Sequence, residues 1–291
     1  MSAELAAPAN GPEEKQRPGE QKIEEIEIDL FVQGVFRHYG VDFRNYALPS
    51  LRRRLWNMAR AEGVQTISAL QEKVLHDPTA LQRLVLHVSV SVTSMFRDPA
   101  FYRAFRDEVV PLLRAHPFIR IWHAGCATGE EVYSMAVLLH EEGLYERCRI
   151  YATDMNEVTL KKAKEGIFPL NLMHDNESDY AKAGGKGHLS DYYVAKYEHA
   201  IFRQSLKKNL VFSHHNLVID GSFNEFNVIL CRNVMIYFDR VLQTRVHKLL
   251  YGSLRRFGIL GVGRKESLRG TVHEKDYEPL NRHERIYRRV G

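Results

Sequence analysis

The sequence contains few cysteines and no long uninterrupted apolar run. Its three cysteines, Cys126, Cys148 and Cys231, are odd in number and form no Cys-x-x-Cys pair, which argues against a disulfide framework and a zinc site. No apolar run reaches the roughly 20 residues of a membrane helix, and the acidic N-terminus lacks the apolar stretch of a secretory signal. We therefore expect a reduced, cytoplasmic protein without a metal and without membrane insertion.

Charge is unevenly distributed along the chain. Residues 1–29 hold eight acidic and three basic residues, a net charge of −5, whereas the whole chain of 291 residues carries +5. The remaining residues therefore carry +10. A basic body favours an acidic partner, and both nucleic acid and a carboxylate-rich protein surface meet that description.

The first third of the chain predicts a tail and a helical domain. Residues 1–22 are rich in Ala, Pro, Gly and Glu without periodicity, so we expect a disordered acidic tail. Residues 23–90 have helical spacing and predict a small all-helical domain. Its apolar stripes are Ile26, Leu30 and Phe31; Leu51, Leu55 and Met58; and Leu81, Leu84, Val85 and Val88.

Residues 91–291 alternate between strand and helix patterns, which is typical of a doubly wound α/β sheet. Strand candidates lie at 119–122, 149–152 and 228–231. One helix is predicted from Pro99 to Ala115 with Asp98 as its N-cap, and another around 240–257. The alternation breaks at about 181–213, where three glycines and short polar–apolar runs predict a small antiparallel β insertion.

The most informative segment is Ile121–Glu131, IWHAGCATGEE, in which a strand enters a turn and a helix follows. Gly125 and Gly129 allow positive φ and a close approach of the backbone to a ligand, although a tight turn without a ligand has the same pattern. Asp154 ends the next predicted strand, roughly 20–25 residues downstream, where a carboxylate can accept hydrogen bonds from ribose hydroxyls. These features together predict a dinucleotide or S-adenosylmethionine site.

Glu130 and Glu131 directly follow the turn. Two carboxylates at a helix N-terminus repel a pyrophosphate, which binds best to bare amides, but they suit a cationic ligand. S-adenosyl-L-methionine carries a sulfonium and an ammonium group and no phosphate. The sequence therefore favours this methyl donor, with S-adenosyl-L-homocysteine as product, over NAD.

Four blocks of sequence resemble the chemotaxis receptor protein-glutamate O-methyltransferases, the CheR family. In chain order they are SVTSMFRD, AGCATGEEVYSMA, YATDMNEVTLKKAKEGIF and ILCRNVMIYFD, which begin at Ser91, Ala124, Tyr151 and Ile229. The resemblance covers residues 25–290. It implies a helical domain before a Rossmann-like methyltransferase domain with a small β-subdomain, and methylation of glutamates on the cytoplasmic domain of a chemoreceptor-like partner by a monomeric enzyme.

The same resemblance implies a donor site. Thr93 and Arg97 match a TxxxR pattern, Asp154 the ribose-binding acid, and Asn216 with Leu217 the pair that lines the adenine pocket. The full set comprises Ser91, Thr93, Arg97, Gly125, Glu130, Asp154, Asn216, Leu217, Arg232 and Asn233.

Three residues are candidates for catalysis. Tyr237 matches the family tyrosine close to the reactive methyl group. We hypothesise that Tyr237 orients the acceptor and that Arg97 and Arg232 bias the site towards an anionic acceptor. The alternative for each arginine is a salt bridge that shapes the pocket.

A second site is predicted on the helix around residue 55. Leu51, Leu55 and Met58 cluster on one side of this helix, so Arg53 and Arg60 point to the other side with Trp56 beside them. The resemblance implies that Arg53, Trp56 and Arg60 contact the receptor. The alternative is a solvated charged face with Trp56 packed on a neighbouring helix.

Two other functions compete with this interpretation. A nucleic-acid methyltransferase would fit the basic body, but the sequence has neither the [DN]PP[YF] motif nor a Pro-Cys nucleophile, so we expect no nucleic-acid partner. A donor-binding regulator without turnover is the other alternative. It gains support from the segment GVGRKESL, which departs from the family ending by introducing Arg264 and Lys265.

Overall fold

The computed structural model describes residues 18–89 and 93–291. The predicted tail falls mainly on residues 1–17, and these, like residue 91, lie outside the described residues. Helix α1 (Pro18–Tyr39) begins inside the predicted tail. The tail boundary at residue 22 was therefore placed too late. Proline is favoured as the first helical residue because its missing N–H has no partner there.

Four helices form the N-terminal domain: α1, α2 (Leu48–Glu62), α3 (Ile67–His76) and α4 (Pro78–Val88). Leu51, Leu55 and Met58 are buried, as predicted, whereas Ile26 and Leu30 are 59% and 54% exposed. For α1 the prediction holds at Phe31, which is buried, and is wrong for Ile26 and Leu30. The buried apolar residues of α1 are Ile28, Phe31, Val32 and Val35. None of the helices in the described part combines the length and apolar character needed to cross a bilayer.

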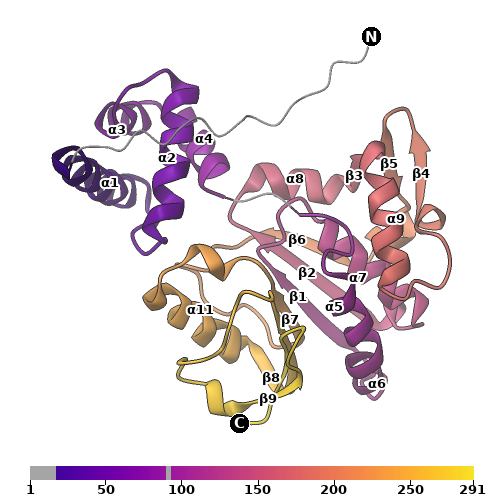
Figure 1. Cartoon of the computed structure of the whole chain (residues 1–291). Helices are drawn as coiled ribbons and strands as arrows, with labels where there is room; N and C mark the ends of the chain where they lie inside the picture. Colours follow the sequence, from indigo (N-terminus) through magenta and orange to yellow (C-terminus); the bar gives the residue numbers. More distant parts are fainter. Residues whose placement is uncertain (1–17, 90–92) are drawn as a thin grey trace.

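A seven-stranded sheet forms the second domain, in the order β6-β2-β1-β7-β8-β10-β9 (Figure 1). The first five of these strands run parallel, and β10 is antiparallel to both of its neighbours. This is the doubly wound α/β arrangement predicted from the sequence. The strands are β1 (Ile119–Ala124), β2 (Cys148–Asp154), β6 (Leu210–His214), β7 (Phe226–Cys231), β8 (Leu254–Val262), β9 (Tyr277–Asn281) and β10 (Ile286–Arg289).

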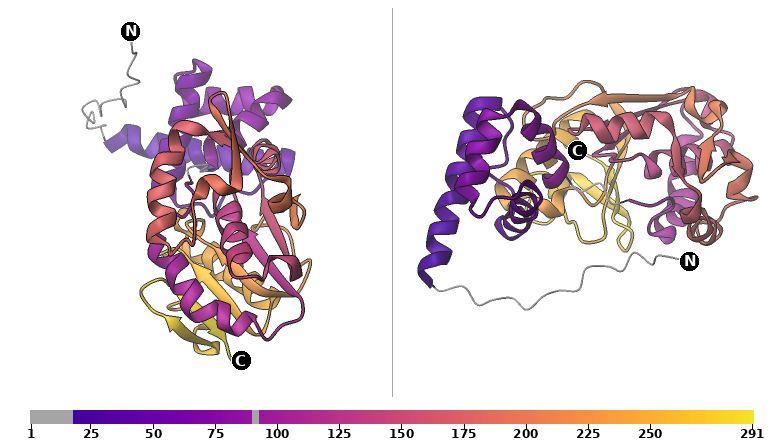
Figure 2. Two further views of the ribbon diagram at one scale, coloured as in Figure 1. Left: turned by 90° about the vertical axis from the view of Figure 1, so that its right-hand side faces the viewer. Right: turned by 90° about the horizontal axis from the view of Figure 1, so that it is seen from above.

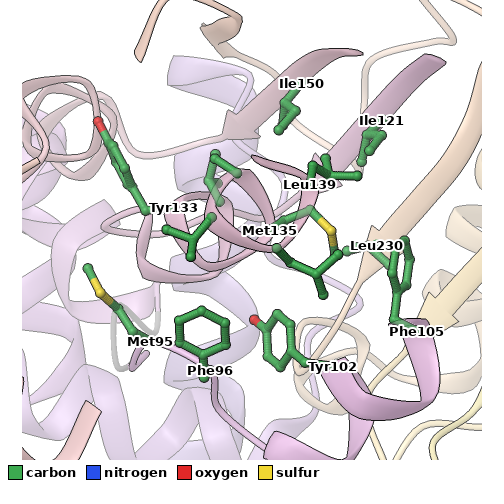
Figure 3. Packing of buried hydrophobic residues seen from close by; sticks show 14 of the residues in the cluster. Met95, Phe96, Tyr102, Phe105, Ile121, Tyr133, Met135, Leu139, Ile150 and Leu230 are labelled. Carbon is green, nitrogen blue, oxygen red and sulfur yellow. The ribbon is translucent and has the colours of Figure 1, made fainter. Parts of the chain in front are cut away.

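Helices cover the sheet through two apolar clusters. Figure 3 shows Met135 and Leu139 of α7 (Glu130–Glu141) between the strand residues Ile121 and Ile150 and an aromatic layer that includes Tyr102. The second cluster joins α11 (Arg240–Ser253) to Trp122 and other residues of the sheet. The two clusters lie on opposite faces of the sheet, because alternate residues of β1 and β7 belong to different clusters.

Two predicted helices have different bounds. The helix expected at 99–115 is broken into α5 (Pro99–Ala104), a π-helical turn (Phe105–Val109) and α6 (Val110–Leu113). Pro111 explains the break, because it offers no N–H to a regular helical ladder. The helix expected to reach Phe257 ends at Ser253, and the next four residues open β8.

The β insertion lies earlier than predicted. Its sheet has the order β3-β5-β4, formed by β3 (Ile167–Pro169), β4 (Tyr193–Lys196) and β5 (His199–Phe202). Along the chain the insertion follows α8 (Glu157–Glu165), and α9 (Met173–Lys182) lies between β3 and β4. The predicted end at residue 213 is wrong, because Leu210–His214 pairs with β2 in the main sheet. Figure 2 shows this insertion and the helical domain at opposite ends of the molecule.

Candidate active site

A pocket opens at the carboxyl ends of β1, β2, β6 and β7, where ligands bind in open α/β sheets. Each strand leads directly into a pocket-lining segment, at Gly125, Asp154, His215 and Arg232 respectively. The helical domain closes the pocket from the other side with Tyr46, Val88 and Ser89. The site is therefore built by both domains.

The structure brings nearly all predicted donor-site residues to this pocket. Its lining includes Thr93, Arg97, Gly125, Asp154, Asn216, Leu217, Arg232, Asn233 and Tyr237. Ser91 lies outside the described residues. Glu130 is not part of the lining: its carboxylate accepts a 2.6 Å hydrogen bond from Thr128 Oγ1. Glu131, one helical step further, lines the pocket in its place.

The glycine turn is held by the neighbouring strand. Gly125 and Gly129 have φ of 78° and 94°, and a Cβ on Gly125 would lie 2.6 Å from Val234 Cγ2. The carboxylate of Asp154 accepts hydrogen bonds from the N–H groups of Ala127 and Asn156, both at 2.9 Å. Burial raises the pKa of Asp154, and these two N–H groups oppose that rise. Asp154 thus fixes the turn from the position expected of a ribose-binding acid.

Arg232 is embedded in ion pairs. Its side chain is 1% exposed, and its guanidinium lies 2.8 Å from Glu131 Oε2 and 2.8 Å from Asp98 Oδ2. The centroid of the Phe101 ring lies 4.0 Å from the guanidinium carbon of Arg232. Glu131 also contacts His123 Nδ1 at 3.0 Å, and Arg232 and His123 together hold the pKa of Glu131 at about 2 against the opposing effect of burial.

This geometry favours the alternative for Arg232, a salt bridge that shapes the pocket. Two carboxylates compensate its charge before any acceptor arrives, so little attraction for an anion remains. The contact with Asp98 also corrects the predicted N-cap. Asp98 has a left-handed φ of 58° and makes no side-chain cap hydrogen bond.

Glu266 is a site residue that the sequence interpretation missed. Its carboxylate is 5% exposed and accepts hydrogen bonds from four backbone N–H groups, at 2.5 to 3.0 Å. The donors are Gly263, Asn233, Val234 and Met235. Three of them belong to the loop between β7 and Tyr237, so Glu266 fixes the shape of that loop. The indication in the sequence was that Glu266 is the only acidic residue of the segment GVGRKESL.

The altered segment GVGRKESL adds less charge to the site than its composition suggests. Arg264 forms a bidentate pair with Glu284, at 2.6 and 3.1 Å. Lys265 is exposed and does not line the pocket. Neither Arg264 nor Lys265 is therefore among the residues that line the pocket.

The helical domain contacts the catalytic candidate Tyr237 directly. Ala47 N–H donates to the carbonyl of Tyr237 at 2.9 Å, and Asp239 N–H donates to the carbonyl of Asn45 at 2.9 Å. Tyr46 packs edge-to-face on Phe238 with ring centroids 5.2 Å apart. The start of α2 is therefore fixed beside Tyr237, which spacing along the sequence did not indicate.

The predicted docking face on α2 is only partly exposed. Arg53 and Arg60 face solvent. Trp56 is half-buried and donates its indole N–H to Glu24 of α1 at 2.5 Å, and Arg52 pairs with the same carboxylate. Trp56 thus packs on a neighbouring helix, which was the alternative interpretation, and is not an outward anchor.

The lining residues fit S-adenosylmethionine. Asp154 lies at the end of β2, where a carboxylate can accept hydrogen bonds from ribose hydroxyls. Met155, Leu217 and Val218 supply an apolar surface for a purine. The Asn216 side chain has a fixed orientation in the pocket wall, because its Oδ1 accepts a hydrogen bond from Val218 N–H at 2.9 Å.

Comparisons with known proteins agree with this site. Residues 26–89 match the family model "CheR methyltransferase, all-alpha domain" and residues 91–283 match "CheR methyltransferase, SAM binding domain". A Pseudomonas putida protein named as a methyltransferase, Cher3, is 46% identical to this chain. The match covers 91% of this chain and 97% of the length of that protein. Proteins named chemotaxis protein methyltransferase are 26% identical in both Listeria innocua and Salmonella typhimurium, over 84% and 83% of this chain and 92% and 84% of their own lengths. This chain therefore belongs to the S-adenosylmethionine-binding CheR methyltransferases.

Proposed function

We propose that this protein transfers a methyl group from S-adenosylmethionine to glutamate side chains on the cytoplasmic domain of a chemoreceptor-type partner. The observation that carries the proposal is the position of α2. This basic helix begins beside Tyr237 at the pocket, and it exposes Arg53 and Arg60 to solvent. A partner whose acidic surface docks on α2 would bring its carboxylates close to the pocket.

The chemistry needs no general base and no metal, because a glutamate carboxylate is already ionised at pH 7. A bound donor would supply an electrophilic methyl group. A carboxylate oxygen would attack the methyl carbon and form an O–CH3 bond while the carbon–sulfur bond breaks, so that S-adenosylhomocysteine leaves with the electron pair on its sulfur. The task of the protein is therefore to hold the two groups in line and to exclude water.

The residues of this chain have distinct roles in the proposal. Asp154 and Asn216 hold the nucleoside. Glu131 and Asp98 together carry one more charge than Arg232, so this cluster leaves negative charge near the cationic groups of the donor. Tyr237 orients the acceptor, and Arg97 lies on the pocket wall where it can contact either substrate. Arg232 and Glu266 keep the surrounding loops in place.

The test is incubation with donor labelled on its methyl group and a receptor cytoplasmic fragment. We expect label on the fragment that alkali releases, as a carboxyl ester requires. Arg97→Ala and Tyr237→Phe should lower kcat at saturating donor by about 10- to 100-fold, since small errors in alignment are costly. Unchanged rates would remove the roles assigned to these two residues.

A second outcome would support the alternative of a regulator. In that case the protein would bind S-adenosylhomocysteine in calorimetry but transfer no label to any receptor fragment. The same assay with nucleic acid as acceptor tests the remaining alternative, and label on nucleic acid would contradict the proposed function.

A further inference from the structure

The edge of the main sheet opposite the pocket is rich in arginine. The parallel strands begin at this edge, and β10, which is antiparallel to β8, ends there. Its arginines are exposed or half-buried and come from the starts of β2, β1 and β8 and from the end of β10. They are Arg147, Arg149, Arg120, Arg255, Arg256 and Arg288. Arg147 and Arg149 donate hydrogen bonds to backbone carbonyls, at 3.2 and 3.4 Å.

The acids near this edge do not balance its positive charge. Glu146 is already paired with Lys208, at 2.8 Å. Glu225 and Glu278 are exposed at the starts of β7 and β9. Within residues 18–89 and 93–291, no carboxylate forms an ion pair with any of the arginines of the edge. The edge therefore retains positive charge that can attract an anion.

Two exposed phenylalanines lie among these arginines. Phe118, which directly precedes β1, is 48% exposed, and Phe257 of β8 is 50% exposed. The guanidinium carbons of Arg256 and Arg288 each lie 5.0 Å from the centroid of the Phe257 ring. That of Arg120 lies 5.5 Å from the centroid of the Phe118 ring. Since only β7 separates β1 from β8, these two strands run about 10 Å apart.

A bulge in β8 carries the second phenylalanine. In the ladder of β7 and β8, Phe226 pairs with Leu254 and Val228 pairs with Ile259. Four residues of β8 therefore lie opposite one residue of β7. Within this bulge Phe257 has a left-handed φ of 64°, which is unfavourable for an aromatic residue. Strained residues concentrate at binding sites, where the fold imposes their conformation, and here the strain accompanies an apolar ring exposed to solvent.

Arginine and exposed phenylalanine together fit an anionic lipid surface. Guanidinium groups bind phosphate oxygens in pairs, and an apolar ring is stabilised at the boundary between headgroups and acyl chains. A bilayer offers many phosphates in one plane, so arginines from several strands can contact it together. A single-stranded nucleic acid fits less well. Its bases stack on free aromatic faces, whereas guanidinium groups already lie over the Phe257 ring.

We propose that this arginine and phenylalanine edge adsorbs to a membrane that contains anionic lipids. The pocket opens at the other ends of the same strands, about 20 Å away for strands of six and seven residues. A protein adsorbed through this edge therefore keeps its pocket turned away from the bilayer. Adsorption goes beyond the proposed methyl transfer and requires neither donor nor acceptor.

Co-sedimentation with vesicles tests the proposal. The full chain is mixed at low salt with vesicles of phosphatidylcholine alone, or of equal parts phosphatidylcholine and phosphatidylglycerol. We expect binding to the second kind only, and weaker binding as ionic strength rises. The double variant Arg255→Gln/Arg256→Gln should lower the partition coefficient by about 30-fold, because each basic side chain near an anionic surface contributes about fivefold.

Phe257→Gly tests the apolar contribution at little cost to the fold. Glycine adopts a positive φ without strain, so the free energy of unfolding should stay close to that of the wild-type protein. The partition coefficient should fall by about tenfold, as expected for a half-exposed ring that becomes buried in the membrane interface. This factor should be the same at two salt concentrations, because salt does not screen apolar burial.

Lys22→Gln/Arg37→Gln is the matched control. It removes two exposed positive charges from α1, in the helical domain, and should leave vesicle binding unchanged. None of the substituted residues lines the pocket. All variants should therefore bind S-adenosylhomocysteine as the wild-type protein does, which shows that they are folded.

Several results would overturn the proposal. Equal binding of the wild-type protein to both kinds of vesicle is one, and an unchanged partition coefficient in Arg255→Gln/Arg256→Gln is another. The same loss in this variant and in the control would mean that only net charge matters. A labelled single-stranded oligonucleotide tests the competing partner. If the protein binds it more tightly than the anionic vesicles, and Phe257→Gly weakens that binding, the edge is a nucleic-acid surface and the lipid proposal is wrong.

Discussion

At the residue scale, one buried carboxylate fixes the loop that carries the catalytic candidates. Glu266 accepts hydrogen bonds from the N–H groups of Asn233, Val234 and Met235, and Asn233 has a left-handed φ of 61°. Burial raises the pKa of Glu266, and the N–H donors counteract that effect. The loop therefore depends on an acceptor with two oxygens.

Replacing Glu266 with glutamine should disturb both the fold and the site. The amide NH2 would face backbone N–H groups, so at least one buried donor would lose its partner. We expect the free energy of unfolding to fall by about 3 kcal/mol, given that hydrogen bonds to a charged acceptor are involved. Urea unfolding measures the loss, and S-adenosylhomocysteine affinity should fall with it. Glu278→Gln, at an exposed position of β9, should change neither value.

At the element scale, the start of α8 links three parts of the pocket. The Asn156 side chain caps the helix by accepting from Val158 N–H at 3.0 Å, and its Nδ2 donates to Ser89 Oγ at 2.9 Å. Its backbone N–H donates to the carboxylate of Asp154. The cap of this helix therefore also orients the acid expected to bind the ribose.

Asn156→Ala should destabilise the protein by about 1 kcal/mol, the usual cost of losing an N-cap. Thr66→Ala provides a matched control, since Thr66 caps α3 by accepting from Ala69 N–H at 3.0 Å and does not line the pocket. Both variants should lose similar stability in thermal unfolding. Only Asn156→Ala should weaken S-adenosylhomocysteine binding, and equal donor affinities in the two variants would contradict the proposed link.

At the scale of the whole molecule, the two domains share one pocket and the helical domain offers its basic helix to a partner. Arg53→Glu should raise the KM for a receptor fragment by about tenfold at low salt, through loss of complementary charge. The difference should shrink as ionic strength rises. S-adenosylhomocysteine affinity should stay constant, because Arg53 does not line the pocket.

Charge reversal at Arg256 is the control for this prediction. It changes the net charge by the same amount on an exposed part of β8. Equal effects of Arg53→Glu and Arg256→Glu on the receptor KM would mean that only the overall charge matters, and would contradict docking on α2.

Much of this organisation is readable along the chain. Regular apolar spacing and glycine turns depend on local backbone preferences, so the α/β sheet, the turn at Gly125 and the acid at Asp154 follow from the sequence. Boundaries were less predictable, since Leu210–His214 became part of the main sheet only by pairing with β2.

Only the tertiary structure decided which charged side chains near the pocket are compensated by ion pairs. Arg232 and Arg54 are both arginines near the pocket, yet the first is compensated by Glu131 and Asp98 and the second lies on the ring of Tyr237. Asp98 is 134 positions away from Arg232. Spacing along the chain carries no information about such pairs, because folding brings the partners together across different strands and domains. The sequence by itself determined the donor turn and the family. Only the tertiary structure decided that the charge of Arg232 is compensated, because Glu131 and Asp98 reach it from other elements of the fold.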